Sequence, residues 1–409
     1  MEHGLDVTLV AVLAACIVAW SLLSARLERA NVTAPMVFVA LGLLLATEPV
    51  NLVEVPVRSE GLRTLAEVTL ALLLFHGAAY VDLRMLLHDA GVPLRLLVVG
   101  LPLTVAAGTG LAVLLLTDID PWAAAAIAAA VAPTDAALGE AVTEDEEVPQ
   151  RIRRTLSVES GLNDGIATPF VLFFVATAVG DEEARAMTGP GDALAQMALG
   201  VLVGLAVGYV GGRLLAASLR RSWVVEDYQA IMSIALALAC YSASVAVGGN
   251  GFIAAFVGGL AFGTVVDAPV RDVTLRFDIR TGELLSLLVW FFFGAVMLPS
   301  VADATWQVVL FAVLALTVMR MVPVAVSLLG SGNGLATVAF IGWFGPRGMA
   351  SVVFGLIAFD ELQGGDADVV LTAVSLTIAL SVVAHGLSAQ PWARRYAMRS
   401  MQAEEQQRS

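Results

Sequence analysis

The run ESGLNDG, residues 159–165, lies within a mostly apolar stretch, 153–178, that is long enough to cross a membrane as a helix. An ionisable side chain in the middle of a membrane helix costs ~2.5–3.5 kcal/mol on insertion scales, so such residues usually mark functional sites. Two carboxylates, an amide and a hydroxyl in one run therefore indicate an ion or proton site. The alternative is that they only join helices through hydrogen bonds.

The helical period separates these polar residues into two faces. At 3.6 residues per turn, Ser160 and Asp164 share one face, whereas Glu159 and Asn163 share the adjacent one. We expect the first face to bind an ion and the second to brace the structure.

A second polar run, Pro133-Thr134-Asp135, interrupts the Ala-rich stretch 121–142. Pro133 lacks an N–H and disfavours helical backbone at Ala132, so we expect a discontinuous helix that resumes after Asp135. Unwound backbone that lines a cavity offers oxygens to small cations, which makes the Thr134 carbonyl and Asp135 candidate ligands. The glycines at 161 and 165 are expected to let the two runs cross closely.

Two arginines lie deep in later apolar stretches, Arg320 within 305–329 and Arg347 within 334–359. A buried guanidinium needs a carboxylate or carbonyls, and we expect Arg320 to pair with Glu159, which would leave Asp164 free to titrate. Arg347 follows a proline in a Gly-rich run and so marks a second predicted break. Breaks in spans five and twelve resemble the paired discontinuous helices of inverted-repeat transporters.

Composition extends this view to the whole chain. Of the 409 residues, 58% are hydrophobic and 14% are charged, which excludes a water-soluble surface. We predict an all-α membrane protein with a transmembrane domain over 1–389 and a short cytoplasmic tail over 390–409. The thirteen predicted spans are 6–24, 33–47, 62–80, 94–116, 121–142, 153–178, 191–218, 228–247, 250–267, 283–300, 305–329, 334–359 and 368–388.

Arginines predict the orientation, because cytoplasmic loops retain positive charge. They gather in alternate loops, for example at Arg153 and Arg154 and again at Arg220 and Arg221, whereas the opposite loops are acidic. The amino terminus is therefore expected outside the inner membrane and the carboxyl terminus inside the cell. Residues 1–6 lack the basic region of a signal peptide, so the first span is expected to be retained.

Thr134-Asp135 followed by residues 159–164 resembles the paired motif of NhaP-like antiporters, the electroneutral branch of the monovalent cation:proton antiporter superfamily. Arg320 and the GPRG run at 345–348 resemble the two later membrane arginines of that family. The resemblance covers essentially the whole chain. It implies a Na+/H+ antiporter, not an enzyme, that forms a homodimer with a dimerisation part and a mobile six-helix core and works by alternating access.

The resemblance also implies a binding site. Asp164, Asp135, Thr134, Ser160 and Asn163 would bind the cation and the proton, with Na+ or Li+ held at Asp164, Thr134 and Ser160. The electrogenic branch carries a second Asp at the position of Asn163, so Asn163 implies one-for-one, electroneutral exchange. No cofactor is expected beyond the transported ions, and the expected partners are the lipid bilayer, monovalent cations and a second copy of the chain, with no nucleic acid.

The sequence departs from this family at Leu74-Phe75-His76-Gly77, where similar antiporters often carry Glu in place of His76. A lone histidine in a membrane helix is more often a hydrogen-bonded core residue than a ligand. We therefore expect His76 to have a structural or pH-tuning role.

Three other functions stay open at this point. K+/H+ exchange would use the same ligands, because selectivity depends on cavity size. An intramembrane aspartyl protease would use Asp135 and Asp164 as an acid–base dyad, but Asn163 replaces the second glycine of the Gly-x-Gly-Asp pattern. A channel is disfavoured, because a titratable carboxylate among braced charges suits a cycle that binds and carries an ion.

Overall fold

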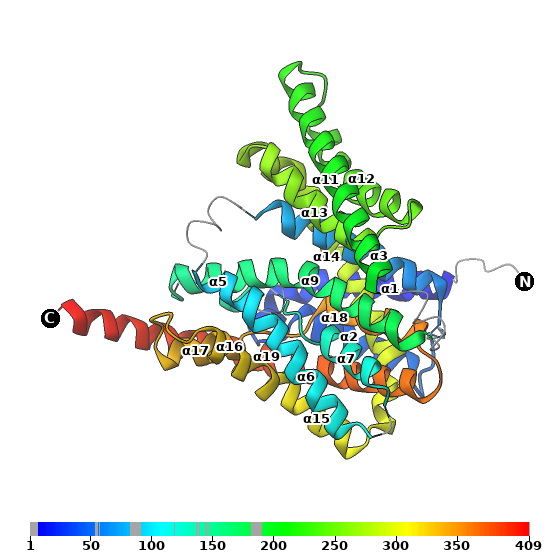
Figure 1. Cartoon of the computed structure of the whole chain (residues 1–409), viewed down its shortest axis with the longest axis vertical. Helices are drawn as coiled ribbons and strands as arrows, with labels where there is room; N and C mark the ends of the chain where they lie inside the picture. The colour runs from blue at the N-terminus through cyan, green and yellow to red at the C-terminus, as the bar shows by residue number, and fades with distance from the viewer. Residues whose placement is uncertain are drawn as a thin grey trace, which may run out of the picture.

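The computed structural model describes residues 7–53, 56, 58–81, 91–117, 119–135, 138, 140–143, 145, 147–180 and 190–408. These residues form helices and no strand (Figure 1). The predicted all-α class is therefore confirmed for the described part of the chain.

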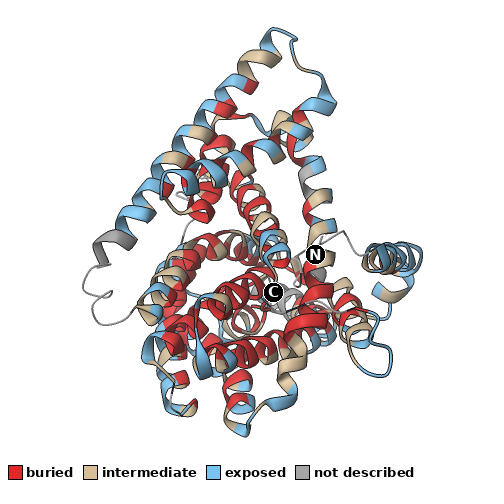
Figure 2. Ribbon diagram, turned by 90° about the vertical axis from the view of Figure 1, so that its right-hand side faces the viewer, coloured by how far each residue is buried: buried red, intermediate tan, exposed pale blue. Residues whose placement is uncertain are grey.

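Apolar side chains lie on the outside of the helix bundle as well as in its interior. Figure 2 shows buried segments toward the centre and exposed segments along the outer faces of the helices. Leu22 is 80% exposed and Leu114 is 79% exposed. Nine helices of the described residues are long and apolar enough to cross a membrane. This surface suits lipid rather than water, while the number of thirteen spans stays a prediction.

One group of helices packs around α13. Helices α3 and α11 lie against α13, and α12 joins this pair to α14, which lies against α2. The contact with α3 is close, because a Cβ on Gly259 of α13 would overlap the Phe75 carbonyl. Figure 1 shows α11, α12 and α13 in its upper part. The group comprises α1 (Val7–Glu28), α2 (Ala34–Ala46), α3 (Glu60–Ala79), α11 (Pro190–Arg220), α12 (Glu226–Ala246), α13 (Gly251–Val265) and α14 (Ala268–Phe292), which continues through η2 (Phe293–Met297) and η3 (Leu298–Asp303).

A second group carries the polar runs found in the sequence. Helix α7 packs against α6 and α9, and α19 packs against α15 and α18. The group comprises α5 (Gly91–Arg95), η1 (Leu96–Gly100), α6 (Leu101–Leu115), α7 (Pro121–Ala130), α8 (Glu140–Thr143), α9 (Gln150–Val179), α15 (Trp306–Leu316), α16 (Val318–Ser327), α17 (Leu335–Trp343), α18 (Met349–Glu361) and α19 (Gly364–Arg408).

Two spans of this second group are discontinuous at the predicted places. Helix α7 ends at Ala130, and residues 131–135 are not helical. Helix α17 ends at Trp343, and α18 begins at Met349. Pro133 and Pro346 lie in the two gaps, where a missing N–H removes a helical hydrogen bond. The prolines favour the two breaks but do not determine them alone, because Pro169, Pro323 and Pro391 lie inside helices.

The span expected over 305–329 matches the candidate span Trp306–Ser327, but one residue interrupts its helix. Helix α15 ends before Thr317, whose φ of −110° and ψ of −85° are not helical. The Thr317 hydroxyl donates to the Val313 carbonyl at 2.8 Å, but Thr168 makes the same kind of bond within the unbroken α9, so this bond does not explain the break. The break frees the Ala315 carbonyl to accept a hydrogen bond from Arg347.

The final helix is longer than the predicted span 368–388. Helix α19 runs for 45 residues, so the predicted boundary between domain and tail at 389/390 lies inside it. Tyr396, beyond that boundary, stacks on Phe340 of α17 with ring centroids 4.2 Å apart. Its hydroxyl is 2.9 Å from the Thr337 hydroxyl. The first turns of the predicted tail thus pack on the transmembrane part.

Candidate functional site

The two Pro-containing breaks meet in the second helix group. The backbone N–H of Asp135 donates to the Pro346 carbonyl at 2.8 Å. In return, the Met349 N–H donates to the Asp135 carboxylate at 3.0 Å. Asp135 thereby accepts from the first turn of α18, where the helix dipole favours a negative charge. The structure thus places Asp135 at the crossing of the two unwound segments.

Arg347 supplies the opposite charge at the crossing. Its side chain is fully buried, and its guanidinium donates to the carbonyls of Ala132 at 2.9 Å and Pro133 at 3.3 Å. A third bond, of 3.3 Å, goes to the Ala315 carbonyl at the unexpected break. These carbonyls lie just past the carboxyl end of α7, where the helix dipole favours a positive charge. Arg347 is thus bound by backbone rather than by a carboxylate.

Glu159 and Arg320 form the pair expected from the sequence. The guanidinium of Arg320 donates to both carboxylate oxygens of Glu159, at 2.6 and 2.9 Å. Both residues are 2% exposed. Two parallel hydrogen bonds hold each charge in a fixed geometry, which a buried ion pair requires. The pair joins α9 to α16.

A chain of short hydrogen bonds joins α9 to the first break. The Asn163 amide donates to the Thr134 hydroxyl at 2.6 Å, and that hydroxyl lies 3.1 Å from the Ser160 hydroxyl. All three residues are buried. The Asn163 amide oxygen is buried and has no hydrogen-bond partner among the described residues. Ser160 and Asn163 thus both face the break, which differs from their expected division between two faces.

Asp164 differs from the other charged groups at this place. Its side chain is partly exposed, and among the described residues the structure gives its carboxylate no hydrogen-bond partner. Asp135 is near enough for its negative charge to repel one on Asp164. A carboxylate that keeps its oxygens available is the kind of group that can exchange a proton for a cation.

The glycines of α9 do not make the expected crossing. A Cβ on Gly165 would overlap the ring of Phe256 in α13, and a Cβ on Gly161 would have no neighbour within 4 Å. The segment lies against the break at Thr134 as expected, but through Ser160 and Asn163 rather than through the two glycines. Gly165 instead lets the two helix groups approach each other, because Phe256 belongs to the first group.

His76 lies on α3, in the first helix group. Its ring contacts Tyr80 one turn later, with centroids 5.0 Å apart, and its Nδ1 has no partner among the described residues. The neighbouring Gly77 faces the carbonyl of Gly161. His76 is therefore on the helix that faces α9, and its pH-tuning role stays a prediction.

Sequence reasoning missed a second layer of contacts at the crossing. The Ser381 hydroxyl accepts from the Arg347 backbone N–H at 2.6 Å and lies 3.0 Å from His385 Nδ1. The His385 Nε2 is 3.0 Å from the Trp343 carbonyl, at the end of α17. One signal was present, because Ser381 and His385 are separated by one helical turn in an apolar stretch. This layer ties α19 to the second break.

Comparison with known proteins shows what the chain resembles. Residues 12–395 match the family model described as the sodium/hydrogen exchanger, transmembrane. The solved structure of the sodium proton antiporter MjNhaP1 from Methanocaldococcus jannaschii at pH 8 has a TM-score of 0.79 at 18% identity and covers 95% of this chain and 99% of that one. At that identity the likeness shows the fold.

Two curated proteins add sequence similarity. A probable Na+/H+ antiporter of Schizosaccharomyces pombe is 25% identical over 255 residues, which is 58% of this chain and 33% of that protein. A K+/H+ antiporter, NhaP, of Alkalimonas amylolytica is 25% identical over 272 residues, which is 66% of this chain and 46% of that protein. The chain thus spans a third to a half of the length of these relatives.

Proposed function

The chain belongs to the sodium/hydrogen exchanger family, and we propose that it exchanges a monovalent cation for a proton across the membrane, with Asp164 as the group for which the two ions compete. The observation that carries this proposal is the state of the charged side chains at the crossing. Glu159 is bound by Arg320, Arg347 by carbonyls, and Asp135 by the Met349 N–H. Asp164 has no such partner among the described residues.

The same hydrogen bonds of the charged side chains support the exchange of one cation for one proton. The carboxylates of Glu159 and Asp135 already accept hydrogen bonds from Arg320 and Met349, whereas that of Asp164 accepts none from the described residues. Asn163 cannot titrate. One proton then leaves Asp164 as one cation arrives, and the loaded forms carry equal charge.

We propose Na+ or Li+ as the cation, held by Asp164 with oxygens of Thr134 and Ser160. The buried amide oxygen of Asn163 adds an oxygen without a partner among the described residues. Because the curated relatives include Na+/H+ and K+/H+ antiporters, K+ is the second candidate. An aspartyl protease is disfavoured, because Asp135 already accepts a hydrogen bond from α18.

Transport by the purified chain in proteoliposomes tests the proposal. A pH-sensitive dye inside the vesicles reports proton movement when Na+, Li+ or K+ is added. We expect a response with wild type and none with Asp164→Asn, because an amide neither takes a proton nor attracts a cation strongly. The matched control is Asp120→Asn, because Asp120 caps α7 by accepting from the Trp122 N–H at 2.8 Å and Asn caps equally well.

Two results would overturn the assignment. If Asp164→Asn exchanged ions at the wild-type rate, the cation and the proton would have to compete for another residue. Loss of exchange in both Asp164→Asn and Asp120→Asn would show that the amide change acts on folding rather than on ion binding.

A further inference from the structure

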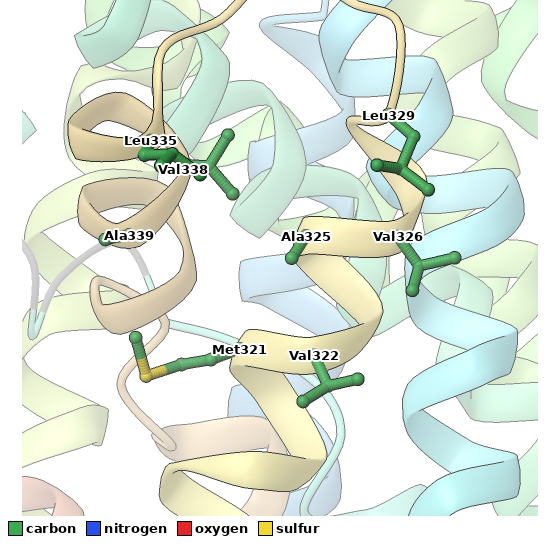
Figure 3. Close-up of a pocket in the computed structure, with 8 residues that line it drawn as sticks. All are labelled: Met321, Val322, Ala325, Val326, Leu329, Leu335, Val338 and Ala339. Carbon is green, nitrogen blue, oxygen red and sulfur yellow. The ribbon is translucent and has the colours of Figure 1, made fainter.

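An apolar groove lies between α16 and α17, and none of the proposed ion-binding residues lines it. Its volume is about 460 Å³, and all the residues that line it are apolar. Figure 3 shows Met321, Val322 and Val326 on one wall and Leu335 and Val338 on the other. A groove of this size and lining fits a hydrocarbon chain.

One end of the groove lies at the connection between the two helices. Leu329 and Leu335, which line this end, are 71% and 89% exposed. The arginine distribution predicts that this connection is cytoplasmic, because the eleventh predicted span runs inward. The groove therefore extends from the membrane interior to the inner surface of the bilayer, where the headgroups of lipids lie.

A positive charge stands at that end. Arg95, at the carboxyl end of α5, is exposed and donates from Nη1 to the Leu329 carbonyl at 2.8 Å. Guanidinium groups have five donors, and within the described ranges the structure gives Arg95 no carboxylate partner. The sequence has no Asp or Glu between Asp303 and Asp360. No acidic side chain of α16, α17 or their connection offsets this charge.

The start of α17 adds to the positive field. Its N-cap is Gly334, which provides no side-chain acceptor, so the first N–H groups of the helix carry the positive end of the dipole. Leu335, the first residue of α17, also lines the groove. The carboxyl end of α16 lies here too and takes one Arg95 hydrogen bond, so the rest of the Arg95 guanidinium and the first turn of α17 supply the positive charge at this end of the groove.

We propose that this groove binds one acyl chain of an anionic phospholipid, whose phosphate lies against Arg95 and the first turn of α17. A zwitterionic lipid would fill the groove with its chain, but its headgroup would not match this charge. Anionic lipids are also those enriched at the cytoplasmic surface, where the groove is predicted to open. The bound lipid would fix α16, which holds Arg320, against α17.

Native mass spectrometry of the purified full-length chain tests the proposal, with phosphatidylglycerol and phosphatidylcholine offered in turn. We expect one retained phosphatidylglycerol per chain in preference to phosphatidylcholine. Arg95→Gln should lower that preference about fivefold, which corresponds to the ~1 kcal/mol per basic residue near an anionic surface. Arg221→Gln is the matched control, because Arg221 lies over the Trp223 ring at the end of α11.

A second variant tests the chain-binding part separately. Val326→Trp fills the groove with an indole, and it should fold normally because Val326 is 45% exposed. Retention of either lipid should fall in this variant while its thermal melting stays close to that of wild type. If Arg95→Gln and Arg221→Gln prefer phosphatidylglycerol over phosphatidylcholine to the same extent, the proposed headgroup contact is wrong. Undiminished retention of lipid by Val326→Trp would overturn the lipid assignment. Conversion of a dimer to a monomer in this variant, with lipid retention unchanged, would also overturn it, because a second copy of the chain would then occupy the groove.

Discussion

Asp135 accepts a hydrogen bond from the Met349 backbone N–H, at 3.0 Å, so a carboxylate from one broken helix caps the start of another. Arg347 does the converse when it donates to the Ala132 carbonyl at 2.9 Å. The break after α7 thus supplies a negative charge to the start of α18, and the break before α18 supplies a positive charge to the end of α7. These hydrogen bonds hold the unwound backbone at the crossing, although the Nε of Arg347 has no hydrogen-bond partner among the described residues.

The space around the Asp135 carboxylate makes the first prediction. A Cβ on Gly348 would overlap that carboxylate, so Gly348→Ala should displace Asp135, lower the melting temperature and abolish exchange. Gly161→Ala is the control, because its Cβ would meet nothing within 4 Å and alanine favours a helix. Thermal melting and dye-monitored exchange of both variants check this. Equal behaviour of the two would mean that the packing of Gly348 does not hold Asp135.

Replacement of Asp135 itself separates capping from ion binding. Asp135→Asn keeps an acceptor for the Met349 N–H, whereas Asp135→Ala removes it and should cost about 1 kcal/mol more stability. Both variants should bind the cation more weakly, because both lack the carboxylate charge near Asp164. The measurements are the melting temperature and the cation concentration for half-maximal exchange. Wild-type affinity in Asp135→Asn would remove Asp135 from the ion site.

The Glu159–Arg320 pair should be much more sensitive than a surface pair. Removal of either partner leaves an uncompensated buried charge, so Glu159→Gln or Arg320→Met should cost about 3–5 kcal/mol or prevent folding, and the double variant should recover expression. The exposed Arg280–Glu283 pair, at 2.8 Å, is the control, and its single variants should cost less than about 1 kcal/mol. Expression and melting temperature report both. Similar losses for the two pairs would contradict a bracing role.

Electroneutral exchange makes a prediction about voltage and pH. A K+/valinomycin potential imposed on proteoliposomes should leave the Na+-driven rate unchanged, because both loaded forms of Asp164 carry the same charge. Apparent cation affinity should fall as pH falls, because protons then compete for Asp164, and at high pH exchange should slow because the protonated form is scarce. A rate that follows the potential would mean that a second group, Asp135 or Glu159, also releases a proton.

Local signals in the chain were sufficient for part of this architecture. Pro133 and Pro346 lie in the two main breaks and favour them, because a proline removes a helical donor, although Pro169 lies inside α9 without breaking it. The Glu159–Arg320 pair was also predictable. Few charged residues lie within the apolar stretches, so each of them has few possible partners. The break at Thr317 had no such signal in the sequence. Threonine is common in membrane helices, and a threonine bonded to the carbonyl one turn back also occurs within the unbroken α9.

The rest depended on contacts between distant segments. Capping of α18 by Asp135, and the packing of Gly165 on Phe256 rather than on the break, follow from how helices of different spans are placed. Periodicity within one helix gives the direction of a side chain but not its neighbour. For the same reason, Asn163 was expected on a bracing face, whereas it shares Thr134 with Ser160.

Helix α19 is much longer than the predicted span 368–388, which makes its last turns a convenient place for a label. At ~1.5 Å per residue its 45 residues have a contour of about 68 Å, roughly twice the ~30 Å thickness of the hydrocarbon layer. Tyr396, which follows the predicted span 368–388, still holds the helix to Phe340. Met398, 53% exposed, lies just past this contact. A spin or fluorescent label there would report the orientation of α17 and α19 without a probe in the candidate ion site.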